Sequence, residues 1–202
     1  VKTAICATSS HFSTAEKQYR FPLELGNQRP PVAQWTVTGA GATMLSLNGD
    51  DSCNKITMAT FGKVVDYGIV DANNMGAAMA PAAMNTLIAH FEDTNTKPKD
   101  YDLILTGDLG KLGSEILRDL MERNGYPLGK NYSDCGQMIY NDHQHTYQGG
   151  SGAGCSASVF NSFVLGQLSK KVYKKVLFLA TGALLSPTTT FQGDSIPAIS
   201  HA

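Results

Sequence analysis

The feature that most limits how this chain can fold is a glycine-rich turn that leads directly into an apolar helix. The turn contains Gly149, Gly150, Gly152 and Gly154, and apolar residues at helical spacing follow over 156–168. Glycine accepts positive φ and lets the backbone approach a neighbour or a ligand closely. A helix entered in this way presents free N–H groups and the positive end of its dipole. The stretch therefore predicts either a tight strand-to-helix connection or a binding loop.

Three interpretations of this turn stay open from the residues alone. Cys155 lies where the helix field is strongest, and His143 and His145 lie shortly upstream. The turn could hold a catalytic cysteine–histidine pair, bind an anion, or be a tight turn whose small residues serve packing. If the His-Gln-His segment is extended, both rings fall on one side. A metal site would still need a third ligand, for which Asp134 and Asp142 are the candidates.

Composition narrows the class of protein. The chain has 202 residues, 42% of them hydrophobic and 16% charged, which is typical of a folded globular protein. The net charge of -1 does not favour a nucleic-acid partner. The four cysteines are widely spaced and form no CxxC pair, which argues against zinc and fits a reduced intracellular compartment. The longest apolar run, Val176 to Leu185, is much too short to cross a membrane and predicts a buried strand.

The order of elements predicts an α/β fold. Strands are expected at 2–8, 34–47, 56–70, 101–106 and 176–180, followed by a last strand in the tail. Helices are expected at 75–91, 113–124 and from the glycine-rich turn to about 168. Pro81 suggests that the first of these helices begins near Ala80. The polar stretch 9–31 carries His11, Lys17, Arg20 and Arg29 and is expected to be a long functional loop. Because the chain opens on a strand without an initiator Met, we expect its N-terminus to lie further upstream.

A second candidate site follows the strand 101–106. Gly107 and Asp108 come directly after it, at the edge where α/β sheets tend to place ligands, and Lys111 is close behind. We expect Asp108 to cap the helix that follows. If Asp108 served a ligand instead, its carboxylate would repel a dianion unless calcium or a proton intervened.

Four segments carry a resemblance to a known family: 61–71 (FGKVVDYGIVD), 105–113 (LTGDLGKLG), 132–140 (YSDCGQMIY) and 145–155 (HTYQGGSGAGC). The chain resembles the thiolase-fold condensing enzymes of the ketoacyl synthase III type, and most closely the stage V sporulation protein AD family of spore-forming bacteria. The resemblance covers essentially the whole chain. It implies a thiolase-like α-β-α-β-α layered fold. Residues 1–50 would be the end of the N-terminal half, and 53–202 most of the C-terminal half.

The chain departs from the catalytic pattern of the family it resembles, which argues against condensing activity and favours a fold retained for binding. The family nucleophile, a cysteine at a helix start, would precede Val1, so Cys155 is expected to be structural. The family histidine falls where this chain has Thr106-Gly-Asp108, and the family asparagine falls at or near Ser151. Both groups normally stabilise a thioester oxyanion. We therefore expect no catalytic residue in this chain.

By this resemblance the protein binds dipicolinic acid, alone or with calcium, for uptake into the developing spore. It would work with membrane subunits of a sporulation channel assembly, form a homodimer through about 35–45, and lie peripherally at the spore inner membrane of sporulating cells. No cofactor, structural metal or nucleic acid is expected. Tyr140 and Tyr147 are candidate flat walls. The predicted ligand-binding residues are Gly107, Asp108, Lys111, His143, His145, Gly150, Ser151 and Gly152. The alternatives are an active ketoacyl synthase III-like acyltransferase and a ligand-free scaffold for the membrane subunits.

Overall fold

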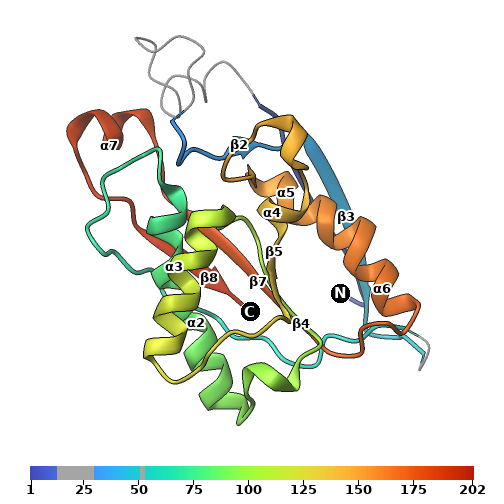
Figure 1. Cartoon of the computed structure of the whole chain (residues 1–202). Helices are drawn as coiled ribbons and strands as arrows, with labels where there is room; N and C mark the ends of the chain where they lie inside the picture. The colour runs from blue at the N-terminus through green and yellow to red at the C-terminus, as the bar shows by residue number, and fades with distance from the viewer. Residues whose placement is uncertain (13–29, 51–52) are drawn as a thin grey trace.

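A four-stranded sheet lies at the centre of the structure, a computed structural model that describes residues 1–12, 30–50 and 53–202. The strand order is β5–β4–β7–β8. Strands β5 (Tyr132–Asp134), β4 (Leu103–Thr106) and β7 (Val176–Ala183) are parallel, whereas β8 (Ala198–His201) is antiparallel to β7. Helices connect the parallel strands (Figure 1), so the predicted α/β class is confirmed.

Side chains alternate along each strand and therefore reach both faces of this sheet. Each face is buried in its own apolar cluster. On β4, Ile104 points into one apolar cluster, while Leu103 and Leu105 point into the other. On β7, Leu177 joins the first cluster and Phe178 packs against the second. Strands of this kind read as continuous apolar runs, which is why the sequence predicts β4 and β7 correctly.

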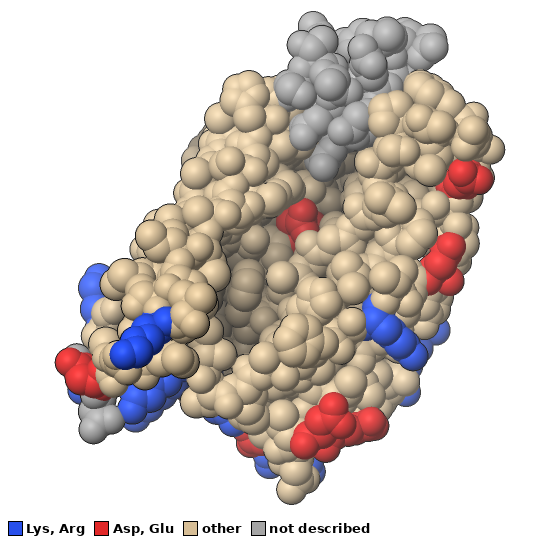
Figure 2. Space-filling view, turned by 180° about the vertical axis from the view of Figure 1, so that it is seen from behind, with Lys and Arg blue, Asp and Glu red and all other residues tan. Residues whose placement is uncertain are grey.

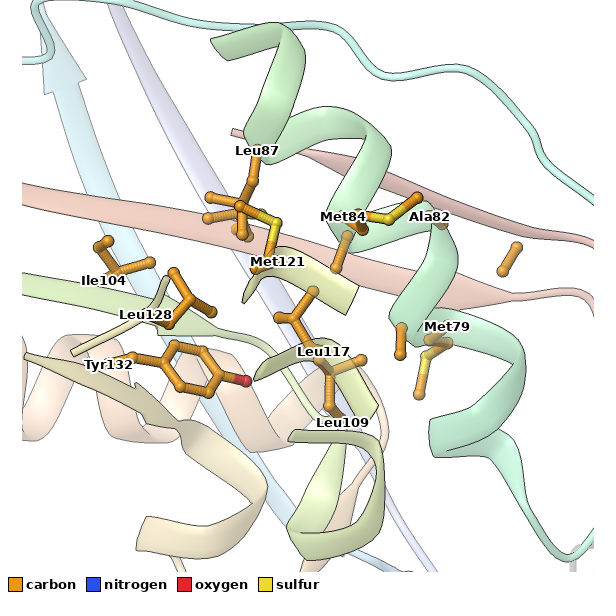
Figure 3. Packing of buried hydrophobic residues seen from close by; sticks show 14 of the residues in the cluster. Met79, Ala82, Met84, Leu87, Ile104, Leu109, Leu117, Met121, Leu128 and Tyr132 are labelled. Carbon is orange, nitrogen blue, oxygen red and sulfur yellow. The ribbon is translucent and has the colours of Figure 1, made fainter. Parts of the chain in front are cut away.

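Helices α2 (Met75–Thr94) and α3 (Gly110–Arg123) cover one face of the sheet. Figure 3 shows their methionines and leucines pointing toward one another and toward Ile104 of the sheet. Asn74 begins α2 by accepting a hydrogen bond from the Ala77 amide at 3.2 Å. The predicted start near Ala80 is therefore wrong, because this cap begins the helix at Met75 and Pro81 lies inside it.

The opposite face is covered by one helical segment that follows the glycine-rich turn. It consists of α5 (Ala153–Val159), the π-helical turn η4 (Phe160–Val164) and α6 (Leu165–Ser169). Cys155, Val159 and Val164 form a cluster with the leucines of β4. The helix predicted from the turn to about 168 is confirmed, although a π-helical turn interrupts its α-helical hydrogen bonding.

A two-stranded antiparallel sheet lies outside this helical segment and consists of β1 (Thr3–Ser10) and β3 (Gly39–Ser46). We call this pair the hairpin below, although β2 lies between its strands in the chain. The small residues of β3 allow close approach, since a Cβ on Gly41 would lie 2.6 Å from the Ala157 carbonyl oxygen of α5. The layers therefore follow one another in the order α2 and α3, central sheet, α5–α6 segment, hairpin (Figure 1). The strand predicted over 34–47 divides in two, because Trp35–Thr36 (β2) pairs instead with Gly150–Ser151 (β6).

The prediction of a long strand over 56–70 is wrong. This segment runs beside β8 and forms one isolated bridge, between Val65 and Ala198, with further backbone hydrogen bonds at Thr60 and Ile69. Gly68 has a φ of +72°, and many side chains of the segment are exposed, so a continuous ladder does not form.

Short elements complete the described chain. They are η2 (Pro98–Asp100), α4 (Cys135–Met138), η3 (Asp142–Gln144) and α7 (Pro187–Gln192). The predicted last strand is confirmed as β8, while α7 was not expected. The predicted functional loop falls largely outside the described residues, together with Lys17, Arg20 and Arg29. Among the helices that the structure describes, none combines the length and apolar character needed to cross a membrane.

Candidate functional site

The loop after β4 and the loop before α5 meet at the carboxyl end of the central sheet. The Asp108 carboxylate joins them: its Oδ2 accepts hydrogen bonds from the Ser151 hydroxyl at 2.9 Å and the Gly152 amide at 3.0 Å. Its Oδ1 accepts from the Thr181 hydroxyl of β7 at 2.8 Å. Asp108 is buried. One carboxylate thus holds the glycine-rich turn against two strands of the sheet.

The expectation that Asp108 caps α3 is wrong, because a different carboxylate does so. Asp134 accepts from the amides of Leu109 and Gly110 at 2.8 and 2.9 Å, and from the Thr106 hydroxyl at 2.7 Å. It also caps α4. Burial raises the pKa of Asp134 to about 7, against the opposing effect of these hydrogen bonds. Asp108 does not cap α3 and instead accepts hydrogen bonds from the glycine-rich turn.

The glycines of the turn are required by close packing. Gly149 and Gly152 have φ of +99° and +96°, and a Cβ on Gly150 would lie 2.6 Å from the Ile139 side chain. The amides are also in use, because Gly152 donates to Asp108 and Gly154 donates to the Ser10 hydroxyl at 2.8 Å. The geometry therefore favours the packing interpretation of the turn over that of an open anion-binding loop.

Two cysteines lie beneath the turn. Cys135 and Cys155 are fully buried in the cluster that packs on β4. Burial raises the pKa of both thiols well above the ordinary value, so neither is a thiolate near neutral pH. This environment fits a structural role for Cys155 and disfavours the catalytic cysteine–histidine interpretation.

The predicted cations lie apart from this cluster. His143 is in the 3₁₀ turn η3 and His145 follows it in the left-handed conformation with φ of +50°, so the segment is not extended. Both histidines are exposed, and Lys111 forms a salt bridge with Asp142 of the same turn at 3.2 Å. The structure thus brings Gly107, Asp108, Gly150, Ser151 and Gly152 together, and places Lys111, His143 and His145 outside them. The part of the chain that the structure describes contains no group of three or more potential ligands placed to hold a metal ion.

Two residues of the cluster were missed at the sequence level. Thr181 holds Asp108 from β7, and Gln34 donates through Nε2 to the carbonyl oxygens of Asp108 at 2.6 Å and Gly150 at 3.0 Å. A threonine inside the apolar run 176–185 was a visible signal. Gln34 carried none, because its partners lie far away in sequence.

The molecule is hollowed on its rear face. Figure 2 shows that the walls of this hollow are almost free of charge and that an acidic group lies inside it. Of the described residues that this view shows, the charged group inside the hollow is therefore acidic.

Comparison with known proteins assigns the chain to a family. The family model for stage V sporulation protein AD matches residues 1–202. The chain belongs to the stage V sporulation protein AD family. It is 50% identical over 200 residues to the stage V sporulation protein AD of Bacillus subtilis (strain 168), a match that covers 99% of this chain and 59% of that protein. The chain therefore spans little more than half the length of this curated relative, and the family gives it a role in sporulation.

Proposed function

We propose that this member of the stage V sporulation protein AD family belongs to a catalytically silent, thiolase-like protein that binds dipicolinic acid for uptake into the developing spore. The ligand is a planar aromatic ring with two carboxylates, which calls for cations or N–H donors and a flat wall.

The observation that carries the proposal is the pairing of Asp108 with Ser151. The resemblance places these residues at or beside the positions where condensing enzymes hold the histidine and asparagine that stabilise an oxyanion. Here the Asp108 carboxylate accepts hydrogen bonds from the Ser151 hydroxyl and the Gly152 amide. A fixed negative charge at this point opposes a developing oxyanion, since catalysis of this type needs donors aimed at the new charge. This arrangement supports binding over acyl transfer.

The remaining partners follow from the same proposal. Membrane subunits of a sporulation channel assembly would hold the protein at the spore inner membrane, and a second copy would pair through about 35–45. Residues 1–50 would complete one thiolase-like half and 53–202 would form most of the other. The hairpin β1–β3, which lies apart from the central sheet, is consistent with that division.

Titration calorimetry of the complete protein with dipicolinate tests the proposal. We expect saturable binding at millimolar ligand or below. Isophthalate, which has the same two carboxylates but no ring nitrogen, is the matched ligand, and each titration is repeated with calcium. Absence of saturable dipicolinate binding under both conditions overturns the proposal.

Two further measurements separate the alternatives. Incubation with radiolabelled acyl-CoA that leaves a covalent acyl-cysteine would favour a ketoacyl synthase III-like acyltransferase. Co-purification with membrane subunits from sporulating cells, together with failed ligand binding, would favour a scaffold.

A further inference from the structure

The central sheet separates charge along the direction of its strands. Because β4, β5 and β7 are parallel, the loops that precede them lie together at the amino end of the sheet, and the loops that follow them lie at the carboxyl end. The preceding loops, 95–102, 124–131 and 170–175, contain seven lysines and two aspartates. The following loops, 107–109, 135–149 and 184–197, contain three aspartates and neither lysine nor arginine. The amino end is therefore the basic end.

Most of this positive charge lies in the turn 170–175, which joins α6 to β7 and which we call the lysine turn. It contains Lys170, Lys171, Lys174 and Lys175, and the first three of these side chains are exposed. Among the described residues, none of the four forms a salt bridge. The Asp102 carboxylate lies beside the turn, because its Oδ2 accepts hydrogen bonds from the amides of Lys174 and Lys175 at 2.7 and 2.9 Å. Asp102 therefore offsets one of the four positive charges.

One end of the hairpin adds a fifth lysine to this surface. β3 starts beside Gly154, and further along it the Thr43 hydroxyl donates to Asn161 at 2.7 Å. The strand therefore runs in the same direction as the α5–α6 segment and ends toward α6 and the lysine turn. At this end the Leu47 amide donates to the carbonyl oxygen of Lys2 at 3.0 Å, and both side chains are exposed.

Other acidic residues near the amino end do not cancel this charge. Glu92 and Asp93 lie in the last turn of α2, and Glu122 lies in the last turn of α3. These two helices cover the face of the sheet opposite to α6. In the loop after the hairpin, the described residues Asp50 and Lys55 offset each other. Figure 2 shows basic groups at the lower left of the molecule, away from the acidic group in the hollow.

Exposed apolar side chains lie among these lysines. Val172, between Lys171 and Lys174, is 60% exposed, and Leu47 at the end of the hairpin is 80% exposed. Lysines attract anionic lipid headgroups, and apolar side chains beside them enter the membrane interface. A nucleic acid fits less well, because the lysine turn contains no arginine, the residue that binds phosphates in a bidentate manner. The chemistry of this surface therefore favours an anionic bilayer.

We propose that the lysine turn and Lys2 bind directly to the surface of an anionic lipid bilayer. The carboxyl end of the sheet, with the Asp108 cluster, then faces away from the bilayer toward the aqueous phase. The location at the spore inner membrane rests on the proposed function, whereas the preference for anionic lipid rests on the lysines themselves.

Flotation of the complete protein with lipid vesicles tests this proposal. We expect binding to vesicles that contain phosphatidylglycerol, no binding to phosphatidylcholine alone, and weaker binding as salt is added. Each lysine near an anionic surface strengthens binding about fivefold. Lys170→Gln should therefore weaken vesicle binding about fivefold, and the charge reversal Lys171→Glu about 25-fold. The matched control is Lys63→Glu, the same reversal at an exposed lysine outside this surface, which should change binding by less than about twofold.

Thermal unfolding of each variant checks that the fold is intact. The proposal is overturned if binding does not depend on phosphatidylglycerol, or if Lys171→Glu and Lys63→Glu have equal effects. It is also overturned if the protein binds duplex DNA or RNA through the same lysines and does not bind vesicles. Calorimetry with dipicolinate separates this proposal from the proposed function, because Lys171→Glu should keep the wild-type Kd. If the wild-type protein binds vesicles as expected but not dipicolinate, the proposed function falls and the lipid contact stands.

Discussion

Asp108 is the residue on which the geometry of the candidate site most depends. Its carboxylate accepts from Ser151 and Gly152 of the glycine-rich turn and from Thr181 of β7, so its three partners lie on two separate segments. Buried hydrogen bonds to a charged group stabilise a fold by about 1.5–3 kcal/mol. The residue therefore holds two loops and a strand in register, whichever ligand the protein binds.

Replacing Asp108 by Asn should lower the free energy of unfolding by about 2 kcal/mol, because an amide has one acceptor oxygen and turns its NH₂ group toward donors. Urea denaturation of the complete protein measures this change. The control is Asp71→Asn, since Asp71 is exposed and accepts from the Asn73 amide at the surface. We expect that control to stay within about 0.5 kcal/mol of the wild type. Equal effects of the two variants would contradict the assignment of Asp108 as a clamp.

At the scale of elements, α2 and α3 cross with almost no space between their backbones. A Cβ on Gly113 would lie 2.7 Å from the Gly76 Cα, and a Cβ on Gly76 would lie 2.5 Å from the Leu109 carbonyl oxygen. Both contacts involve main-chain atoms, which cannot turn aside as a flexible side chain can. The two glycines thus set the distance between the helices that cover one face of the sheet.

Gly113→Ala should destabilise the protein by about 1–3 kcal/mol, the usual cost of overpacking, although alanine is the better helix former. The matched control is Gly166→Ala in α6, where an added Cβ meets no atom within 4 Å. That change should stabilise by up to about 1 kcal/mol. Thermal unfolding of both variants measures the opposite signs, and a neutral or stabilising Gly113→Ala would show that the crossing is adjustable.

The elements that sequence reasoning predicted correctly are those with a strong local signal. The apolar runs of β4 and β7 and the periodicity of α3 needed no knowledge of the rest of the fold. The segment 56–70 has the same β-branched composition, but whether it forms a ladder depends on β8, at the far end of the chain. The division of 34–47 likewise depends on the distant pairing of Trp35 with Gly150.

The candidate site was predictable only in part, for the same reason. The sequence singled out Asp108 and the glycine-rich turn, because each follows or precedes a regular element. It did not indicate that they bind each other, nor that Asp134, and not Asp108, caps α3. Contacts between distant segments were the missing information in each case.

For the whole molecule, the outer face of the hairpin is an apolar surface that the described residues leave uncovered. Ile5 and Met44 lie opposite each other in the register and are 74% and 71% exposed. Neither β1 nor β3 contains a charged residue. Exposed apolar strands of this kind promote association, and a two-stranded sheet has little stability of its own.

We therefore expect residues 1–202, produced alone, to self-associate. Light scattering and size-exclusion chromatography should show concentration-dependent assemblies. Replacing Ile5 and Met44 by lysine should reduce them, because the charges oppose strand pairing at that face. Lysine at Val172, a similarly exposed apolar residue outside the hairpin, is the control and should have little effect. A monomeric wild-type chain at high concentration would contradict the prediction.

The hairpin also has a consequence for how the protein is made. Its contact with α5 includes the hydrogen bond between Ser10 and Gly154, which are 144 positions apart. At a synthesis rate of about 5–20 residues per second, roughly 7 to 30 seconds separate the emergence of these two residues from the ribosome. During that interval the two strands lack α5, the helix against which they pack in the folded structure. Their uncharged faces are therefore without this cover for seconds after synthesis, which is a period in which strand pairing with another chain competes with folding.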